Sequence, residues 1–357
     1  MSTLSLLETL VSLSVQVGIL IWLTSWATRN RRLGSDPDVY WSAMHVCILV
    51  LTAAAFYLPH VRLITWADFQ PTESHPFADE AVAATGRLGG WIWVAGSSFI
   101  LAACVGGIVR ATMLVRRAAI DPSIGQIGDD EIDGITTPTR IETRVSTDNI
   151  SPFCWQFHRP VIVVPEIVRT FPSSEQAAIL RHELAHLRLQ HPLHLFLQRM
   201  VEAIYWFHPM VWWSSKQAAA AREIRCDRAA VRSRHEVVDY LRSLLRLIES
   251  KVRPLSRLPA GVGFMGDASL LSQRANILGE YVEHAPAPVK AGRAVAIITL
   301  FALTCSLVWL PVNPYASRRS AWSPWPSWSS QLLNATGIEV RDYEVDGHRL
   351  SLHNHDQ

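Results

Sequence analysis

The sequence predicts a mainly α-helical integral membrane protein with four transmembrane helices and one inserted α+β domain. Hydrophobic residues make up 49% of the 357 residues and charged residues only 18%, which is apolar for a soluble protein of this length. Four apolar runs occur, at residues 4–26, 41–58, 89–114 and 294–312. Each is long enough to cross a hydrocarbon layer of about 30 Å, which takes roughly 20 residues.

Short basic flanks predict how these runs are oriented. Arg29, Arg31 and Arg32 follow the first run, Arg116 and Arg117 follow the third, and Lys290 and Arg293 precede the fourth. Because basic residues favour the cytoplasmic side, the N-terminus and the mildly acidic loop expected at residues 60–88 should lie outside. The chain then divides into a membrane region with three spans (1–114), a cytoplasmic domain (115–293), a fourth span (294–312) and a short extracytoplasmic tail (313–357). The first run has no basic residue before it, so we expect an uncleaved span instead of a signal peptide.

Charge and cysteine content exclude some classes of function. The formal net charge of +2 gives no reason to expect direct nucleic acid binding. The five cysteines are scattered, and their spacing indicates neither a disulfide framework nor a cysteine-based zinc site. A reducing compartment suits this pattern.

An H-E-x-x-H motif, His182-Glu183-Leu184-Ala185-His186, lies at the centre of the inserted domain. The surrounding residues favour a helix that starts after Pro172, with Ser173 and Gln176 as a capping box. Residues four apart share a helix face, so the two imidazoles can bind one Zn²⁺ ion. Glu183 can then reach a water molecule beside the metal as a general base. The pattern is typical of a zinc hydrolase.

Two downstream carboxylates, Glu202 and Glu223, are the candidates for the third zinc ligand. Leu189 and Pro192 replace the Gly and His that a metzincin requires, which excludes that class. The spacing favours Glu223, because Asp227 follows four residues later in a long helical segment and can orient a ligand histidine. An ion pair with Arg199 explains Glu202 without a metal.

Four segments together resemble the BlaR/MecR-type antirepressor metallopeptidases. They are Ser151–Pro165, the H-E-x-x-H helix, Phe207–Trp213 and Glu223-Ile224-Arg225-Cys226-Asp227. The resemblance implies a gluzincin-like zinc peptidase domain in a bacterial plasma membrane protein, with zinc held by His182, His186 and Glu223. It also implies Glu183 as the base and a cytoplasmic protein substrate such as a transcriptional repressor. Gln156 departs from the family, which favours Gly there, so the edge of the cleft is expected to differ.

Other segments position this site. Ile141, Thr143 and Val145 alternate as in a strand, and Val161–Val164 lies between two prolines, which predicts an edge strand able to hold an extended peptide. Residues 237–248 and 270–278 are expected to be helical. The apolar stretch 193–213 suits a helix under the zinc helix better than a span, and its aromatic cluster fits a protein core and a bilayer interface equally well.

Two alternatives to a signalling peptidase remain: a housekeeping membrane zinc protease and a non-catalytic receptor or scaffold. An intact motif argues against the scaffold. His191, His194 and His208 are candidates for stabilising an oxyanion, and nothing selects among them. The oligomeric state cannot be inferred. The tail contains no Lys, so we expect no S-x-x-K penicillin-binding site in it.

Overall fold

The computed structural model describes residues 3–30, 36–57, 76–121, 141–148, 150–156, 159–231, 233–250, 274, 278, 291–306, 309, 333–338, 344–345 and 348–349. The chain forms two compact units. The first comprises Met1–Leu101, Met200–Ser215 and Lys290–Gln357, and the second comprises Ala102–Arg199 and Lys216–Val289. Helices α3, α5 and α6 contribute residues to both units.

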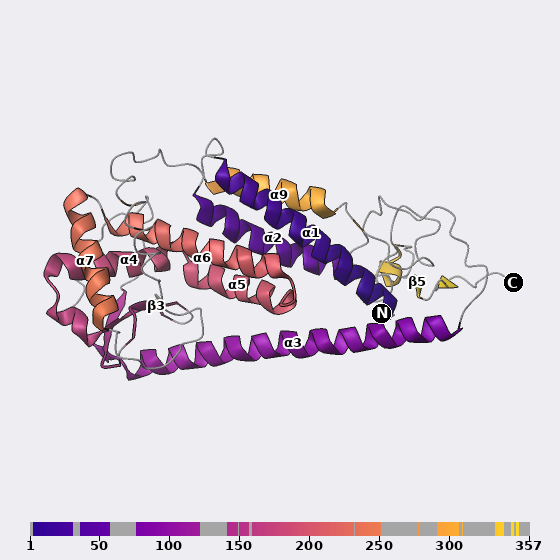
Figure 1. Ribbon diagram of the computed structural model, residues 1–357, viewed down its shortest axis with the longest axis horizontal. Coiled ribbons are helices and arrows are strands. Elements are labelled where there is room, and N and C mark those ends of the chain that lie inside the picture. Colours follow the sequence, from indigo (N-terminus) through magenta and orange to yellow (C-terminus); the bar gives the residue numbers. More distant parts are fainter. Residues whose placement is uncertain are drawn as a thin grey trace. The chain divides into compact units, whose positions relative to one another are not determined.

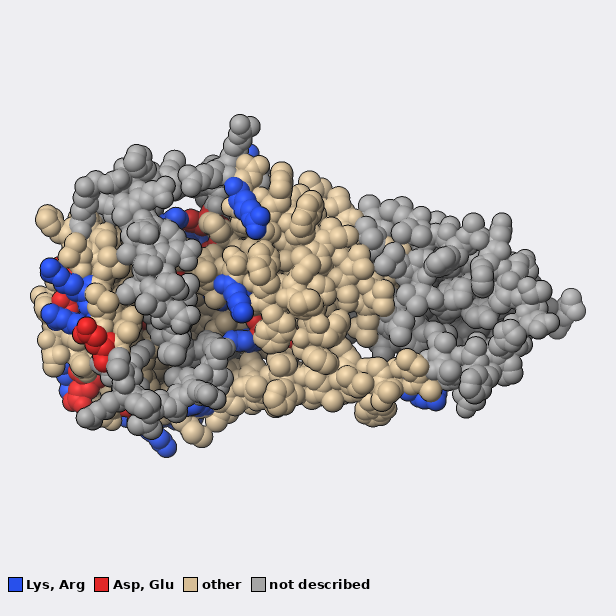
Figure 2. Space-filling view, viewed as in Figure 1, with Lys and Arg blue, Asp and Glu red and all other residues tan. Residues whose placement is uncertain are grey.

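The first unit is built from apolar helices. α1 (Thr3–Arg29), α2 (Pro37–Tyr57) and α9 (Ala291–Ser306) pack against one another (Figure 1). Their contacts bury large side chains such as Leu20, Met44 and Ile298, each fully inaccessible. On the face drawn in Figure 2, charged side chains gather around α7, and few lie over α1 and α9.

Three described helices are long and apolar enough to cross a membrane, within α1, α2 and α3 (Pro76–Arg117). α3 exposes bulky apolar side chains, with Trp91 73% and Phe99 72% accessible, which suits contact with lipid. The protein is therefore an integral membrane protein. α9 has 16 residues, shorter than the roughly 20 that a span takes, so the fourth span stays a prediction. Most of residues 307–312 lie outside the described residues.

The prediction that residues 60–88 form a loop is wrong for its second half. α3 begins at Pro76, so residues 76–88 are helical. Proline suits the first turn of a helix, and several alanines follow it. The first half, 58–75, lies outside the described residues.

The second unit contains a four-stranded sheet in the order β1-β2-β4-β3. The strands are β1 (Ala119–Ile120), β2 (Glu142–Ser146), β3 (Phe153–Trp155) and β4 (Val161–Pro165). β4 is parallel to β2 and antiparallel to β3. The prediction of an edge strand at Val161–Val164 is wrong, because all of β4 is buried between two neighbours. Its β-branched run is typical of such an interior strand. The edge on this side is β3.

The zinc-motif helix α4 (Ser173–Arg188) packs against β3, β4 and α7 (Arg234–Ser250). Its apolar face joins the core through Ile179, Leu180 and Leu184, which meet Ile162 and Val164 of β4. This packing fixes the rotation of α4 and hence the direction of its histidines. The short 3-10 helix η2 (Glu166–Thr170) leads into it.

α4 begins at the predicted residue but without the predicted capping box. Pro172 occupies the N-cap position, no side chain caps the helix, and the Gln176 amide donates to the Phe171 carbonyl at 2.9 Å. At the other end Gln190 adopts a left-handed conformation (φ 54°), which ends the helix. Pro192 falls in the first turn of α5 (His191–Ile204).

The apolar stretch 193–213 forms most of α5, a turn, and the start of α6 (Pro209–Ala230), and we call α5 and α6 together the α5–α6 hairpin. Its tip, residues 204–208, belongs to the first unit and is bound there by polar contacts. Tyr205 Oη lies 2.7 Å from Thr52 Oγ1 of α2, Trp93 Nε1 of α3 donates to the Ile204 carbonyl at 2.8 Å, and His208 Nε2 lies 3.2 Å from the Ser14 carbonyl of α1. Tyr205 is a core residue, whereas Phe207 and Trp213 remain partly exposed.

The tail contains one small antiparallel pair, β5 (Glu344–Val345) with β6 (His348–Arg349). Of the helix expected at 270–278, only Arg274 and Leu278 are described, and both are helical. Leu278 is buried against Tyr240 and Leu244 of α7.

Candidate metal centre

Three predicted ligands converge in the second unit. α4 places His182 and His186 one turn apart, with their Nε2 atoms 3.2 Å from each other. α6 brings Glu223 opposite them, so that Oε2 lies 3.6 Å from His182 Nε2 and Oε1 lies 3.7 Å from His186 Nε2. One ligand atom from each of the three residues lies within 4.8 Å of the others. Glu202 belongs to neither group of candidate metal-ligating side chains found among the described residues.

The Glu223 carboxylate is suited to a cation. Its Oε2 atom is buried and has no hydrogen-bond partner among the described residues, although the side chain as a whole is 35% exposed. A buried carboxylate oxygen without a donor is costly unless a positive charge faces it. Two imidazole nitrogens and one carboxylate oxygen form the donor set of a catalytic zinc site.

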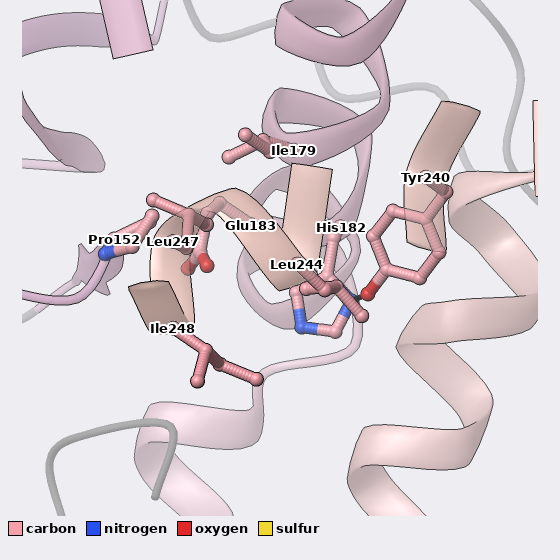
Figure 3. Close-up of a pocket in the computed structure, with 8 residues that line it drawn as sticks. All are labelled: Pro152, Ile179, His182, Glu183, Tyr240, Leu244, Leu247 and Ile248. Atoms are coloured by element: carbon pink, nitrogen blue, oxygen red, sulfur yellow. Dashed lines mark hydrogen bonds between the residues drawn. The ribbon is translucent and has the colours of Figure 1, made fainter. Parts of the chain in front are cut away.

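Glu183 lies beside these ligands, and its side chain lines an apolar pocket (Figure 3). Its side chain is 5% exposed. The pocket is lined by Pro152, Ile179, His182, Glu183, Tyr240, Leu244, Leu247 and Ile248. Burial raises the pKa of Glu183 to about 7, although the positive charges of His182 and Arg274 oppose the rise. A carboxylate in such surroundings is a proton acceptor near neutral pH.

The Nδ1 atom of His182 faces a polar network. Asp227 Oδ1 lies 3.2 Å from it and Tyr240 Oη 2.9 Å, and Tyr240 also donates to Asp227 Oδ1 at 2.7 Å. Arg274 donates to both oxygens of the same carboxylate. Asp227 therefore lies behind the first histidine of the motif, whereas the sequence had predicted only that it can orient one of the ligand histidines.

The Nδ1 atom of His186 faces a second group. His191 Nδ1 lies 3.0 Å from it, and Cys226 Sγ lies 3.3 Å from His191 Nδ1. His186, His191 and Cys226 form a second possible metal-binding trio that shares His186 with the first. This trio lies on the Nδ1 side of His186, and neither His191 nor Cys226 lines the pocket that holds Glu183.

The electrostatics of the site favour a divalent cation. Burial lowers the pKa of His186 to about 3, so this imidazole is neutral and keeps a lone pair. Burial also acts to lower the pKa of His182, but the Asp227 and Glu223 carboxylates outweigh it and raise the value to about 9. Burial opposes ionisation of Glu223 and Asp227, yet their cationic neighbours hold both pKa values below the ordinary range. Once His182 is neutral, the two ionised carboxylates Glu223 and Asp227 exceed the single charge of Arg274 by one negative charge, which a bound cation would neutralise.

Sequence reasoning missed Tyr240, Arg274 and Cys226, and treated His191 only as an oxyanion candidate. Tyr240 was part of an ordinary apolar helix pattern, and Arg274 follows a stretch rich in Pro and Gly. Only the tertiary structure brings them to His182. Of the other oxyanion candidates, His208 contacts Ser14 in the first unit and does not line the Glu183 pocket, and the His194 ring is 6.2 Å from that of His191.

The comparisons with known proteins agree with this geometry. The model of the BlaR1 peptidase M56 family matches residues 6–278. The chain is 31% identical to the regulatory protein BlaR1 of Bacillus licheniformis over 112 residues, which cover 31% of this chain and 19% of that protein. It is 26% identical to the methicillin resistance protein MecR1 of Staphylococcus aureus over 170 residues, 47% of this chain and 28% of the relative. The matches thus span less than a third of either relative's length. Because the family model covers most of the sequence, including the metal centre, the chain belongs to the BlaR1 peptidase M56 family.

Proposed function

We propose that this protein is a membrane-anchored zinc endopeptidase that cleaves a cytoplasmic protein. The observation that carries the proposal is the position of Glu183. Its buried carboxylate lines the same pocket as His182, which converges with His186 and Glu223. A metal site with a structural role would not need a carboxylate base that lines a pocket.

In this proposal the three converging residues hold zinc. Zinc held by these residues would supply Lewis acidity toward the scissile carbonyl. Glu183 accepts a proton from the attacking water and passes it to the leaving amine. Its raised pKa and its burial suit this double role, and the apolar pocket walls limit the access of bulk water.

The pocket also indicates what the substrate presents. Ile179, Leu244, Leu247 and Ile248 favour an apolar side chain next to the scissile bond. β3, the edge strand of the sheet, packs against α4 and begins directly after Pro152 of the pocket wall. An extended peptide can pair with such an edge. The sequence placed this role on β4, and we now propose it for β3. An unstructured protein segment is therefore the expected substrate.

We further propose that the substrate is a transcriptional repressor and that cleavage serves signalling. The support is the family and its relatives, which are named as a regulatory protein and a resistance protein. The basic flanks of the spans support a cytoplasmic site, where such a substrate occurs. A housekeeping protease with the same chemistry would show many substrates, and a scaffold would show none.

The decisive experiment uses Glu183→Gln. This change removes the base and spares the three ligands, so zinc binding should persist. Peptide cleavage should fall by about 10²- to 10⁴-fold. The same variant should trap its substrate from bacterial cytosol, and a cysteine at position 238, where Val238 is exposed on α7, should be labelled only after the membrane is permeabilised. Near-normal cleavage by Glu183→Gln would contradict the proposed chemistry, and capture of many unrelated proteins would favour the housekeeping alternative.

A further inference from the structure

The hydroxyl of Tyr240 lies at the centre of the network behind His182. Figure 3 shows this hydroxyl directed at the imidazole. It lies 2.9 Å from His182 Nδ1, donates to Asp227 Oδ1 at 2.7 Å and accepts from Arg274 Nη2 at 3.0 Å. His182, Asp227 and Tyr240 are each at most 2% exposed. Water is therefore a poor substitute for any of these contacts.

The chemistry of the partners fixes the direction of every hydrogen bond. Arginine only donates and an ionised Asp227 only accepts, so the single phenolic proton goes to Asp227. The oxygen lone pairs of Tyr240 then accept from Arg274 and from His182 Nδ1–H. His182 must carry a proton on Nδ1. Its Nε2 atom, which faces Glu223 and His186, is then the nitrogen that can bind a metal in place of a proton, as a metal-ligating tautomer requires.

Arg274 fixes the orientation of the Asp227 carboxylate. Its Nε atom donates to Asp227 Oδ2 at 2.5 Å, and its Nη2 atom donates to Oδ1. Two parallel bonds from one guanidinium fix the rotation of the carboxylate, which a single contact cannot do. The Nη1 atom is 3.9 Å from Glu223 Oε2, so the same side chain also faces the third ligand.

We propose that Tyr240 and Arg274 are positioning residues of the metal centre, which act through Asp227 to hold His182 in its metal-binding tautomer and orientation. The inference rests on the proposed function for the metal, but not for peptide cleavage. Arg274 lies 47 residues after Asp227 in the chain, so this contact forms only in the folded protein.

Zinc affinity tests the proposal without measuring catalysis. The full chain is purified in detergent with Glu183→Gln, and Zn²⁺ binding is measured by competition with a chromophoric chelator. Tyr240→Phe should bind Zn²⁺ about 10-fold more weakly, since loss of a partner of a ligand histidine typically costs 10- to 100-fold. Its Co²⁺ absorption bands should also shift, because they report the geometry of the ligands. Tyr205→Phe is the matched control: it removes a buried hydroxyl that contacts Thr52 instead, and should leave both readings unchanged.

Arg274→Lys tests the second residue. Lysine keeps the positive charge, so its electrostatic effect on the metal ion is nearly unchanged. The change removes only the pair of parallel hydrogen bonds to Asp227. Zinc affinity should again fall about 10-fold. Arg246→Lys is the control, because Arg246 pairs with Glu175 at 3.2 Å, away from the metal centre. This variant keeps the test informative if Tyr240→Phe does not fold.

The outcomes separate the two proposals. Because both residues act through Asp227, the double variant should lose less affinity than the product of the two single losses. Parental zinc affinity and an unchanged Co²⁺ spectrum in both single variants would overturn this inference alone. The expected affinity losses, combined with absence of cleavage by the chain that retains Glu183, would support the positioning role and overturn only the peptidase.

Discussion

The metal centre and the tip of the α5–α6 hairpin both bury polar groups, but the groups are charged in one and neutral in the other. Around His182, an arginine and three carboxylates lie in contact or close to it, and several pKa values depart from their ordinary range. At the tip, Trp93 and Trp206 donate N–H groups to backbone carbonyls, and Tyr205 pairs with Thr52. The same pair of helices supplies residues to both regions.

The difference follows from the cost of burial. An unpaired charge in an apolar environment is far more costly than a neutral donor, which a helix carbonyl satisfies. The tip can therefore be buried against the apolar helices of the first unit, because its hydrogen-bond donors are neutral. At the candidate metal centre, the buried charges lie where they can neutralise one another and a bound cation. Substitutions at the centre should thus change metal binding, and substitutions at the tip should change stability alone.

The largest effect is expected from the third ligand. Glu223→Ala removes one of three converging donors, so zinc content should fall from about one per chain to near zero. Glu202→Ala, also a buried carboxylate on the hairpin, should keep its zinc because Glu202 lies outside the converging group. Elemental analysis of the two purified variants measures this.

A reversed result would assign the third ligand to Glu202. Cys226→Ala adds a second comparison, because Cys226 belongs to the trio that shares His186. Zinc retained in Cys226→Ala and lost in Glu223→Ala would place the metal on the Glu183 side. The opposite pair of results would place it against His191.

A smaller effect is expected from Asp227→Asn. The amide keeps the shape of the carboxylate but lacks its charge, and one of its two terminal atoms can no longer accept from Arg274. Zinc affinity should fall by about 10- to 100-fold. Chelator competition measures the change, and an affinity equal to that of the parent would show that Asp227 does not orient His182.

The two regions also differ in how far the sequence predicts them. His182, Glu183 and His186 were expected together because helical periodicity alone puts residues 182 and 186 on one face. The choice of Glu223 over Glu202 depended on a four-residue spacing to Asp227, again a local property. The structure brings these residues together, while their role as zinc ligands stays a prediction.

Contacts between distant segments were not predictable in this way. Tyr240 reaches His182, and Arg274 reaches Asp227, only through tertiary packing of residues far apart in the chain. The interior position of Val161–Val164 depends on β2 and β3 pairing on both sides, whereas its flanking prolines indicated an edge. At the hairpin tip, an aromatic cluster fits a core and an interface equally, and only its partners on α1, α2 and α3 decide the matter for Tyr205.

The smallest effect, and the sharpest test of the comparison, is expected from glycine substitutions in α3. A Cβ added at Gly96 would lie 2.2 Å from Trp206 of the hairpin tip, far inside contact distance, whereas one added at Gly106 would meet nothing within 4 Å. Gly96→Ala must therefore displace the indole and should destabilise the protein by about 1–3 kcal/mol, the usual cost of overpacking. Gly106→Ala should be neutral or stabilise by up to about 1 kcal/mol, because alanine favours the helix.

Thermal unfolding in detergent measures the two stabilities, and chelator competition measures zinc affinity in the same samples. If the tip only anchors the hairpin, Gly96→Ala should lower the unfolding temperature. Its zinc affinity should stay within about twofold of that of Gly106→Ala, because sites without shared partners behave independently. A zinc affinity in Gly96→Ala as low as that of Asp227→Asn would contradict this separation. Because α6 is one continuous helix from Pro209 to Ala230, such a result would show that displacement of Trp206 is transmitted along it to Glu223.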